Sequence, residues 1–194
     1  MRKVALWTVL TSVLVFCGCS RPTTEAPAPQ QKVTGSVSVQ YTLAREPVST
    51  AVWVEDAEGR YIRSLYLFVP TWRHPDGLDG TFLEGWLEAS REARKAEEAA
   101  EDVDSITHAS PVSQNKTSDH RWDLRDWRGE KVSPGQYTVR ITCDGPVETV
   151  SWEAQITIGG GRSVVRGKPD RKLPEDFEFR YLKDMKVIYR PDAE

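Results

Sequence analysis

The segment 104–111 reads DSITHASP and places an acid, three hydroxyl side chains and an imidazole within eight residues. Imidazole and carboxylate groups are common metal ligands, so His108 with Asp104, or His120 with Asp123, raises the question of a metal site. The sequence has no HExxH, no ligand pairs at short spacing and no CxxCH. Strand positions an odd number apart face opposite ways, which separates His120 from Asp123. We therefore expect no metal site and surface-exposed histidines.

Motifs for nucleophilic catalysis are also missing from the sequence. It contains no GxSxG and no glycine-rich phosphate loop with lysine. The GGGR stretch at 159–162 lacks a following helix whose N-terminus could hold a phosphate. Nothing specifies the pair of carboxylates, at a set separation, that a glycosidase needs. The sequence predicts a protein without catalytic residues.

Tryptophans offer a different kind of site. Trp72, in PTWRHPDG, and Trp127, in the turn DWRG, are candidates for exposed rings that stack on a sugar or a flat cofactor. Alternating strand patterns surround three further tryptophans, which we expect to be core residues: Trp53, Trp122 and Trp152. The same alternation predicts that the Cys143 thiol is buried and unreactive.

The elements that must position these residues are mostly strands. VTGSVSVQYTL alternates with period two and places Val37, Val39, Tyr41 and Leu43 on one side. Turn sequences separate about seven such strands: Gly59 and Gly129 suit hairpins, and SPGQ suits a type II turn. The segment 159–174 is predicted to be a loop. We expect an all-β fold, an immunoglobulin-like antiparallel β-sandwich spanning residues 33–191.

One segment departs from the strand pattern. From Phe82 to Val103, apolar residues recur at intervals of four and three, which predicts one inserted amphipathic helix. Alanine dominates this stripe, so the helix should pack on an edge or face of the sandwich. An alternative is that the helix binds a partner.

The N-terminus indicates where the chain is located. Arg2 and Lys3 precede a 13-residue apolar run, which is too short to span a membrane but is typical of a signal peptide. Gly18 before Cys19 resembles the lipobox of bacterial lipoproteins, in which cleavage leaves a lipid-modified cysteine as the first residue. The resemblance implies that 1–18 is a signal peptide, that Cys19 is lipidated and that 19–32, rich in proline, is a disordered tether.

Processing at Cys19 would leave 176 of the 194 residues and change the formal net charge from −3 to −5, because Arg2 and Lys3 are removed. This length suffices for one packed core. The acidic balance gives no reason to expect nucleic-acid binding. We expect a chain on the periplasmic side or outer face of the cell envelope, held by its lipid, with an unidentified envelope protein as partner.

Four stretches, VWVEDAEGRYIRSLYLF, PTWR, DSITHASP and HRWDLRDWRGEKVSPGQYTVRI, together resemble the predicted periplasmic family known as domain of unknown function 2271. Members occur among extracytoplasmic flavin-linked redox systems. Their motif at DSITHASP is similar to one in which flavin mononucleotide is attached through its phosphate to a hydroxyl. Asp104, Thr107, Ala109 and Ser110 match this motif, whereas His108 replaces its glycine.

Three functions follow from these observations. The leading expectation is a non-enzymatic binding or accessory protein beside redox partners, with no cofactor and an unmodified Ser110 in a loop. The resemblance implies an alternative, a carrier of covalent flavin held at Ser110 with Asp104 and Thr107 nearby. A third possibility is a carbohydrate-binding surface formed by Trp72 and Trp127.

Overall fold

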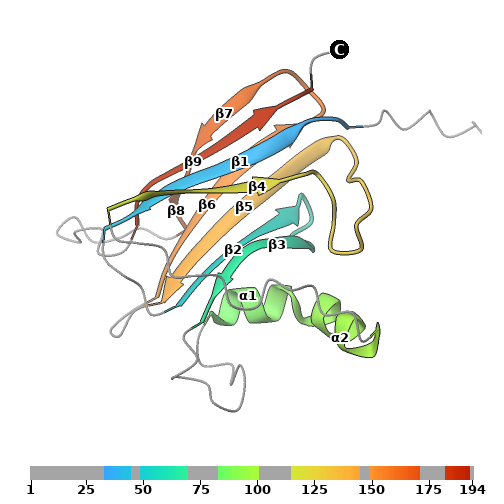
Figure 1. Cartoon of the computed structure of the whole chain (residues 1–194), viewed down its shortest axis with the longest axis vertical. Helices are drawn as coiled ribbons and strands as arrows, with labels where there is room; N and C mark the ends of the chain where they lie inside the picture. The colour runs from blue at the N-terminus through green and yellow to red at the C-terminus, as the bar shows by residue number, and fades with distance from the viewer. Residues whose placement is uncertain are drawn as a thin grey trace, which may run out of the picture.

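The fold is a sandwich of two antiparallel β-sheets, with helices outside one of them (Figure 1). This computed structural model describes residues 33–44, 49–69, 83–100, 115–144, 149–170 and 182–192, the last helical turn, 97–100, without its side chains. We call the four-stranded sheet, in the order β4-β1-β9-β7, sheet A, and the five-stranded sheet, in the order β3-β2-β5-β6-β8, sheet B. The all-β prediction is confirmed in these residues, without evidence for the immunoglobulin-like detail.

The two central strands of sheet A come from opposite ends of the described chain. Its central pair is formed by β1 (Ser36–Leu43) and β9 (Leu182–Arg190), and the outer strands are β4 (Thr117–Trp122) and β7 (Ser163–Arg166). Sheet B contains β2 (Ser49–Asp56), β3 (Tyr61–Phe68), β5 (Gly135–Asp144), β6 (Thr149–Ile158) and the two-residue β8 (Lys168–Pro169).

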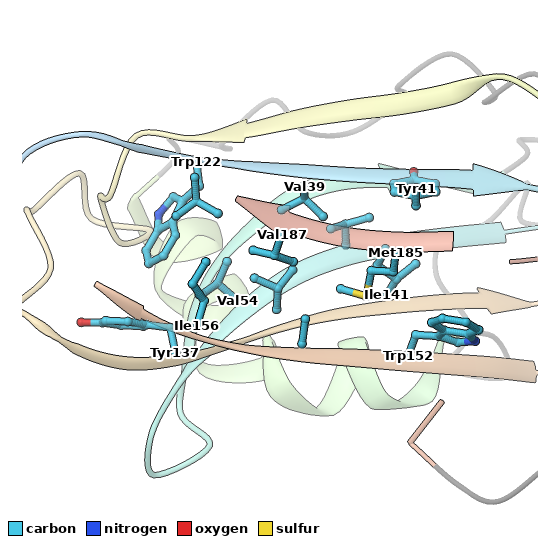
Figure 2. Close-up of a cluster of buried hydrophobic side chains, with 14 of the residues drawn as sticks. Val39, Tyr41, Val54, Trp122, Tyr137, Ile141, Trp152, Ile156, Met185 and Val187 are labelled. Carbon is cyan, nitrogen blue, oxygen red and sulfur yellow. The ribbon is translucent and has the colours of Figure 1, made fainter. Parts of the chain in front are cut away.

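Side-chain alternation along the strands produces the core between the sheets. The predicted inward positions of β1 are fully buried, as are Val139, Ile141 and Cys143 of β5. Large aromatic rings fill the ends of this space, with Trp122 edge-on to Tyr137 at a centroid distance of 5.3 Å and Trp152 at the far end (Figure 2). Burial of these apolar side chains is the main stabilising contribution to the fold.

The helical insertion differs from the expected single helix. It consists of α1 (Glu84–Ala89) and α2 (Arg91–Ala100), separated at Ser90. The Ser90 hydroxyl donates to the carbonyl of Trp86 at 2.7 Å, and serine that bonds back to the preceding turn tends to bend helices. Phe82 and 101–103, the ends of the predicted helix, lie outside the described residues.

A second, smaller core holds α1 against the outer face of sheet B. Trp86 and Leu83 are buried there against Trp53 of β2. Trp86 Nε1 also donates to Ser64 Oγ of β3 at 2.7 Å. This layer explains why seven of the eight residues of β2 are buried, since the strand is covered on both faces. Trp53 is therefore a core residue, as expected, but beneath a helix rather than between the sheets.

Two turn predictions are confirmed, and two local predictions are wrong. Gly59 and Gly129 have φ of 78° and 79° in the tight turns predicted for them. Gly135 instead begins β5 without the positive φ that a type II turn requires, so SPGQ leads directly into a strand. The predicted loop 159–174 contains β7 and β8, because Val164 and Val165 can extend sheet A beside β9.

Candidate functional site

Most residues that the sequence selected for chemistry lie outside the described part of the chain. These are Cys19, Trp72, Asp104, Thr107, His108, Ala109 and Ser110. The structure therefore does not test whether they come together. Among the sequence-selected residues, His120, Asp123, Trp127 and Cys143 are described, and Asp123 is exposed and paired with Arg63 and Arg125.

The structure does fix where the segment 101–114 returns to the sandwich. The Asn115 amide donates to the carbonyl of Leu43, the last residue of β1, at 2.9 Å. Its side-chain oxygen accepts from Lys183 Nζ of β9 at 3.3 Å. Asn115 adopts a left-handed conformation with φ of 56°, which asparagine tolerates better than most residues. These bonds place the start of β4 at the end of sheet A where β1 ends.

His120 forms an aromatic cluster with Tyr41 and Tyr66 on the side of the sandwich where β4 and β3 are the edge strands. Its ring stacks on Tyr41 at a centroid distance of 5.5 Å and is tilted against Tyr66, of sheet B, at 4.6 Å. His120 Nε2 and the Tyr41 hydroxyl share a hydrogen bond of 3.1 Å. His120 is half-buried and not a surface residue as predicted, because it shares the inward face of β4 with Trp122.

Burial shifts the pKa values of two groups in this cluster. It lowers the pKa of His120 by disfavouring the imidazolium, and the charge of Asp119 only partly opposes this effect. It raises the pKa of the Tyr41 hydroxyl well above its usual range. The cluster is thus a neutral group of rings at neutral pH, and burial disfavours a proton on His120.

Trp127 does not present a free ring of the kind that stacks on sugars. It is half-buried, and the Arg128 guanidinium lies 4.5 Å from its ring centroid. Its backbone amide donates to the carbonyl of Ile62 at 2.8 Å, which attaches the turn after β4 to β3. The ring and turn therefore contribute to closing the β3–β4 side of the sandwich.

The Cys143 thiol is fully buried, as predicted. Burial raises its pKa to about 12, despite a contact of 4.0 Å from Thr50 Oγ1. The thiolate, which is the nucleophilic form, is therefore scarce near neutral pH. This cysteine is a core residue and not a reactive group.

A polar network missed by the sequence analysis crosses the outer face of sheet B beside α1. Glu55 is buried and accepts hydrogen bonds from Trp53 Nε1 at 2.8 Å and Arg140 Nε at 2.7 Å. Arg140 also pairs with Glu153 at 3.2 Å, and Glu153 with Lys168 at 3.6 Å. Alternation along β2, β5 and β6 could have grouped these residues, but only after the strand order was known. The network consists of mutually satisfied charges and holds the strands together.

Within the described ranges, no group of three or more His, Cys, Asp or Glu side chains is arranged to hold a metal ion. The helices described here include none with the length and apolar character needed to cross a membrane.

Comparison with known proteins gives no relative from which a site could be transferred. No family model, curated protein or solved structure matches the chain.

Proposed function

We propose that this chain is a lipid-anchored binding or accessory protein of the bacterial cell envelope, on the extracytoplasmic side of a membrane. The observation that carries the proposal is the N-terminal pattern, in which a positive start and an apolar run lead to Gly18-Cys19 and a proline-rich segment. This pattern is typical of an exported chain that is cut before a lipid-bearing cysteine. Several acyl chains on one cysteine would anchor the protein durably.

The architecture supports a binding role. The space between the sheets is filled by side chains such as Trp122, Ile141 and Trp152, so the groups available to a partner lie on the outer faces and edges (Figure 2). The resemblance to the domain of unknown function 2271 favours partners among flavin-linked redox proteins. In this proposal the sandwich is a scaffold for a binding surface, and it catalyses no reaction itself.

The anchor is tested by fractionating cells that express the native chain or the Cys19→Ser variant. Because the acyl chains would be attached to this thiol, we expect the native protein in the membrane fraction after a high-salt wash. The variant should be released as a soluble protein or remain uncleaved. A processed Cys19→Ser protein that stays with washed membranes would contradict the assignment.

A second candidate function rests on the match of Asp104, Thr107, Ala109 and Ser110 to the flavin-attachment motif. A phosphoester needs a hydroxyl acceptor, which Ser110 supplies, and the small Ala109 leaves room for a modifying enzyme. His108, in place of the motif's glycine, adds bulk at that position, and for this reason we rank the carrier second. In-gel flavin fluorescence of protein from its own host, compared with the Ser110→Ala variant, decides between the two.

The carbohydrate-binding alternative receives no such support. Its one described member, Trp127, is half-buried and lies under Arg128. We therefore do not propose it.

A further inference from the structure

The outer face of sheet A, defined as the side chains of β4, β1, β9 and β7 that point away from the core, carries exposed cations around two buried residues at its centre, Ser38 and Ile188. No described helix packs against this face, since α1 and α2 lie on the side of sheet B (Figure 1). Four exposed cations alternate with the buried positions of their strands: Arg121, Arg166, Lys186 and Arg190. These four cations outnumber the two carboxylates of the face, Asp119 and Asp184, although the chain as a whole has a net charge of −3.

These cations are not neutralised by their neighbours. None of the four forms an ion pair within the described residues. Asp119 is instead engaged by two neutral groups, Ser38 Oγ at 2.6 Å and Gln40 Nε2 at 3.1 Å. Arg140 and Lys168 on sheet B show the opposite arrangement, because each is paired with a glutamate.

Two of the cations are also cross-strand neighbours. Lys186 of β9 is directly opposite Arg166 of β7 in the register. Like charges at directly opposite strand positions are destabilising, since their Cβ atoms are only about 5 Å apart. Negative charges of a partner bound to this face would reduce the repulsion between Lys186 and Arg166, so the arrangement favours an anionic partner.

The position of the N-terminus indicates which anionic surface this is. The chain enters β1 at Gly35. The backbone of Gly35 lies so close to that of Arg190 that a Cβ at position 35 would collide with the Arg190 carbonyl oxygen. Thirteen residues, 20–32, separate this domain from the proposed lipidated Cys19. A flexible chain of that length spans about 20 Å, whereas a strand of eight residues such as β1 is about 26 Å long. The proposed anchor would therefore keep the end of the face where the chain enters, beside Arg190, within about 20 Å of the bilayer.

We propose that the outer face of sheet A lies against the anionic phospholipid headgroups of the membrane in which Cys19 is anchored. The orientation rests on the proposed lipid anchor, whereas the charge of the face does not. Each cation near an anionic leaflet strengthens association by about fivefold, and salt weakens this attraction. The lipid holds the protein at the membrane, and the cationic face determines which side of the sandwich points outward to a partner.

The test uses the full chain, purified from its host membrane with Val164→Cys as a reporter. Val164 is 48% exposed on β7, opposite Ile188 on the same face, and the buried Cys143 does not compete for reagent. The protein is placed in vesicles of phosphatidylcholine alone or mixed with an equal amount of phosphatidylglycerol. A membrane-impermeant maleimide then labels the cysteine. We expect labelling about five to ten times slower in the anionic vesicles at low salt.

Two matched controls make this result specific. Lys186→Glu, on the face, should restore fast labelling of Val164→Cys, whereas Arg91→Glu, an equal change of charge on exposed α2, should not. A reporter at Glu92→Cys, also on α2, should label at the same rate in both lipids. Equal rates at Val164→Cys in the two lipids would overturn the proposal and leave an acidic protein as the candidate partner. Slow labelling that persists in Lys186→Glu would overturn it as well.

Flotation of the same samples separates the face from the anchor. A chain that does not float with pure phosphatidylcholine vesicles contradicts the lipid anchor. If that chain still floats with anionic vesicles, and Lys186→Glu abolishes this, the cationic face is supported on its own. A chain that floats with neither composition refutes the inference about the face.

Discussion

His120 shows how the position of one residue on a strand determines its chemistry. In the sequence it is a polar residue between aspartate and arginine, which suggests a surface position. In the fold it points inward, two residues before Trp122, and stacks on Tyr41. The alternation of side chains along β4 could have predicted that His120 points inward with Trp122. The contact with Tyr66, however, depends on how sheet B faces sheet A.

The lowered pKa of His120 predicts a dependence of stability on pH. Because the folded-state pKa is below the unfolded value of about 6.5, the unfolded state binds the proton more readily. Stability should be fully retained above about pH 6.5 and should fall as the pH drops toward the folded-state pKa. The effect is measured as the free energy of unfolding in urea at about pH 8 and about pH 5.

The control for this prediction is His120→Gln, which cannot titrate but can still form a hydrogen bond with Tyr41. The loss of stability between the two pH values should be smaller in this variant than in the native chain. An unchanged loss would show that other groups cause it.

Trp122 is the residue whose truncation should cost the most in the main core. It is completely buried, packs edge-on against Tyr137 and donates from Nε1 to the carbonyl of Arg125 at 2.7 Å. Trp122→Ala should lower the free energy of unfolding by about 3–5 kcal/mol. Val164→Ala, at an exposed position, should change it by less than about 0.5 kcal/mol. Similar effects of the two substitutions would contradict the arrangement of the core.

Glu55 should matter for stability because it is the buried acceptor of the network on sheet B. Glu55→Ala would leave Trp53 Nε1 without its partner and remove one of the two carboxylates that bind Arg140. We expect a loss of about 1–3 kcal/mol in the free energy of unfolding. Thr157→Ala, on the exposed part of β6, provides a matched comparison on the same sheet. A neutral result for Glu55→Ala would mean that the network contributes little.

At the scale of elements, the sequence predicted those parts of the fold whose residues alternate strongly. Strands β1, β2 and β5 have long apolar patterns, and the helical region has a spacing that no strand could use. The sequence did not predict β7 and β8, because strands of four and two residues are too short to show a clear alternating pattern. Such short strands acquire their hydrogen-bond partners only when β9 and β6 lie beside them.

The attachment of α1 depends on few side chains, so one substitution should release it. Trp86→Ala would remove the largest helix residue of the smaller core and its hydrogen bond to Ser64. We expect faster amide hydrogen exchange in α1 with little change in the central strand β5, because the core between the sheets does not include Trp86. Equal acceleration in α1 and β5 would show that the helix and the sandwich unfold as one unit.

At the scale of the whole molecule, the two outer faces of the sandwich differ. The helices lie on the side of sheet B (Figure 1), where the cations Arg140 and Lys168 are paired with glutamates. The cations on the outer face of sheet A form no ion pair within the described residues, and one of them, Arg190, lies beside the entry of the chain at Gly35. The alternation in the sequence locates the cations on strands, but the face that they share follows from the order β4-β1-β9-β7. The segment that resembles a flavin site lies outside the described residues, so its role remains a prediction.

Intact-mass spectrometry of the protein from its own host tests both the proposed lipid anchor and the proposed absence of a bound cofactor. We predict a chain that begins at Cys19 and carries the mass of a lipid on this residue, with no flavin-sized addition. A lipid-free chain that begins at another residue would contradict the anchor. A flavin-sized addition that disappears in Ser110→Ala would instead make the protein an electron carrier.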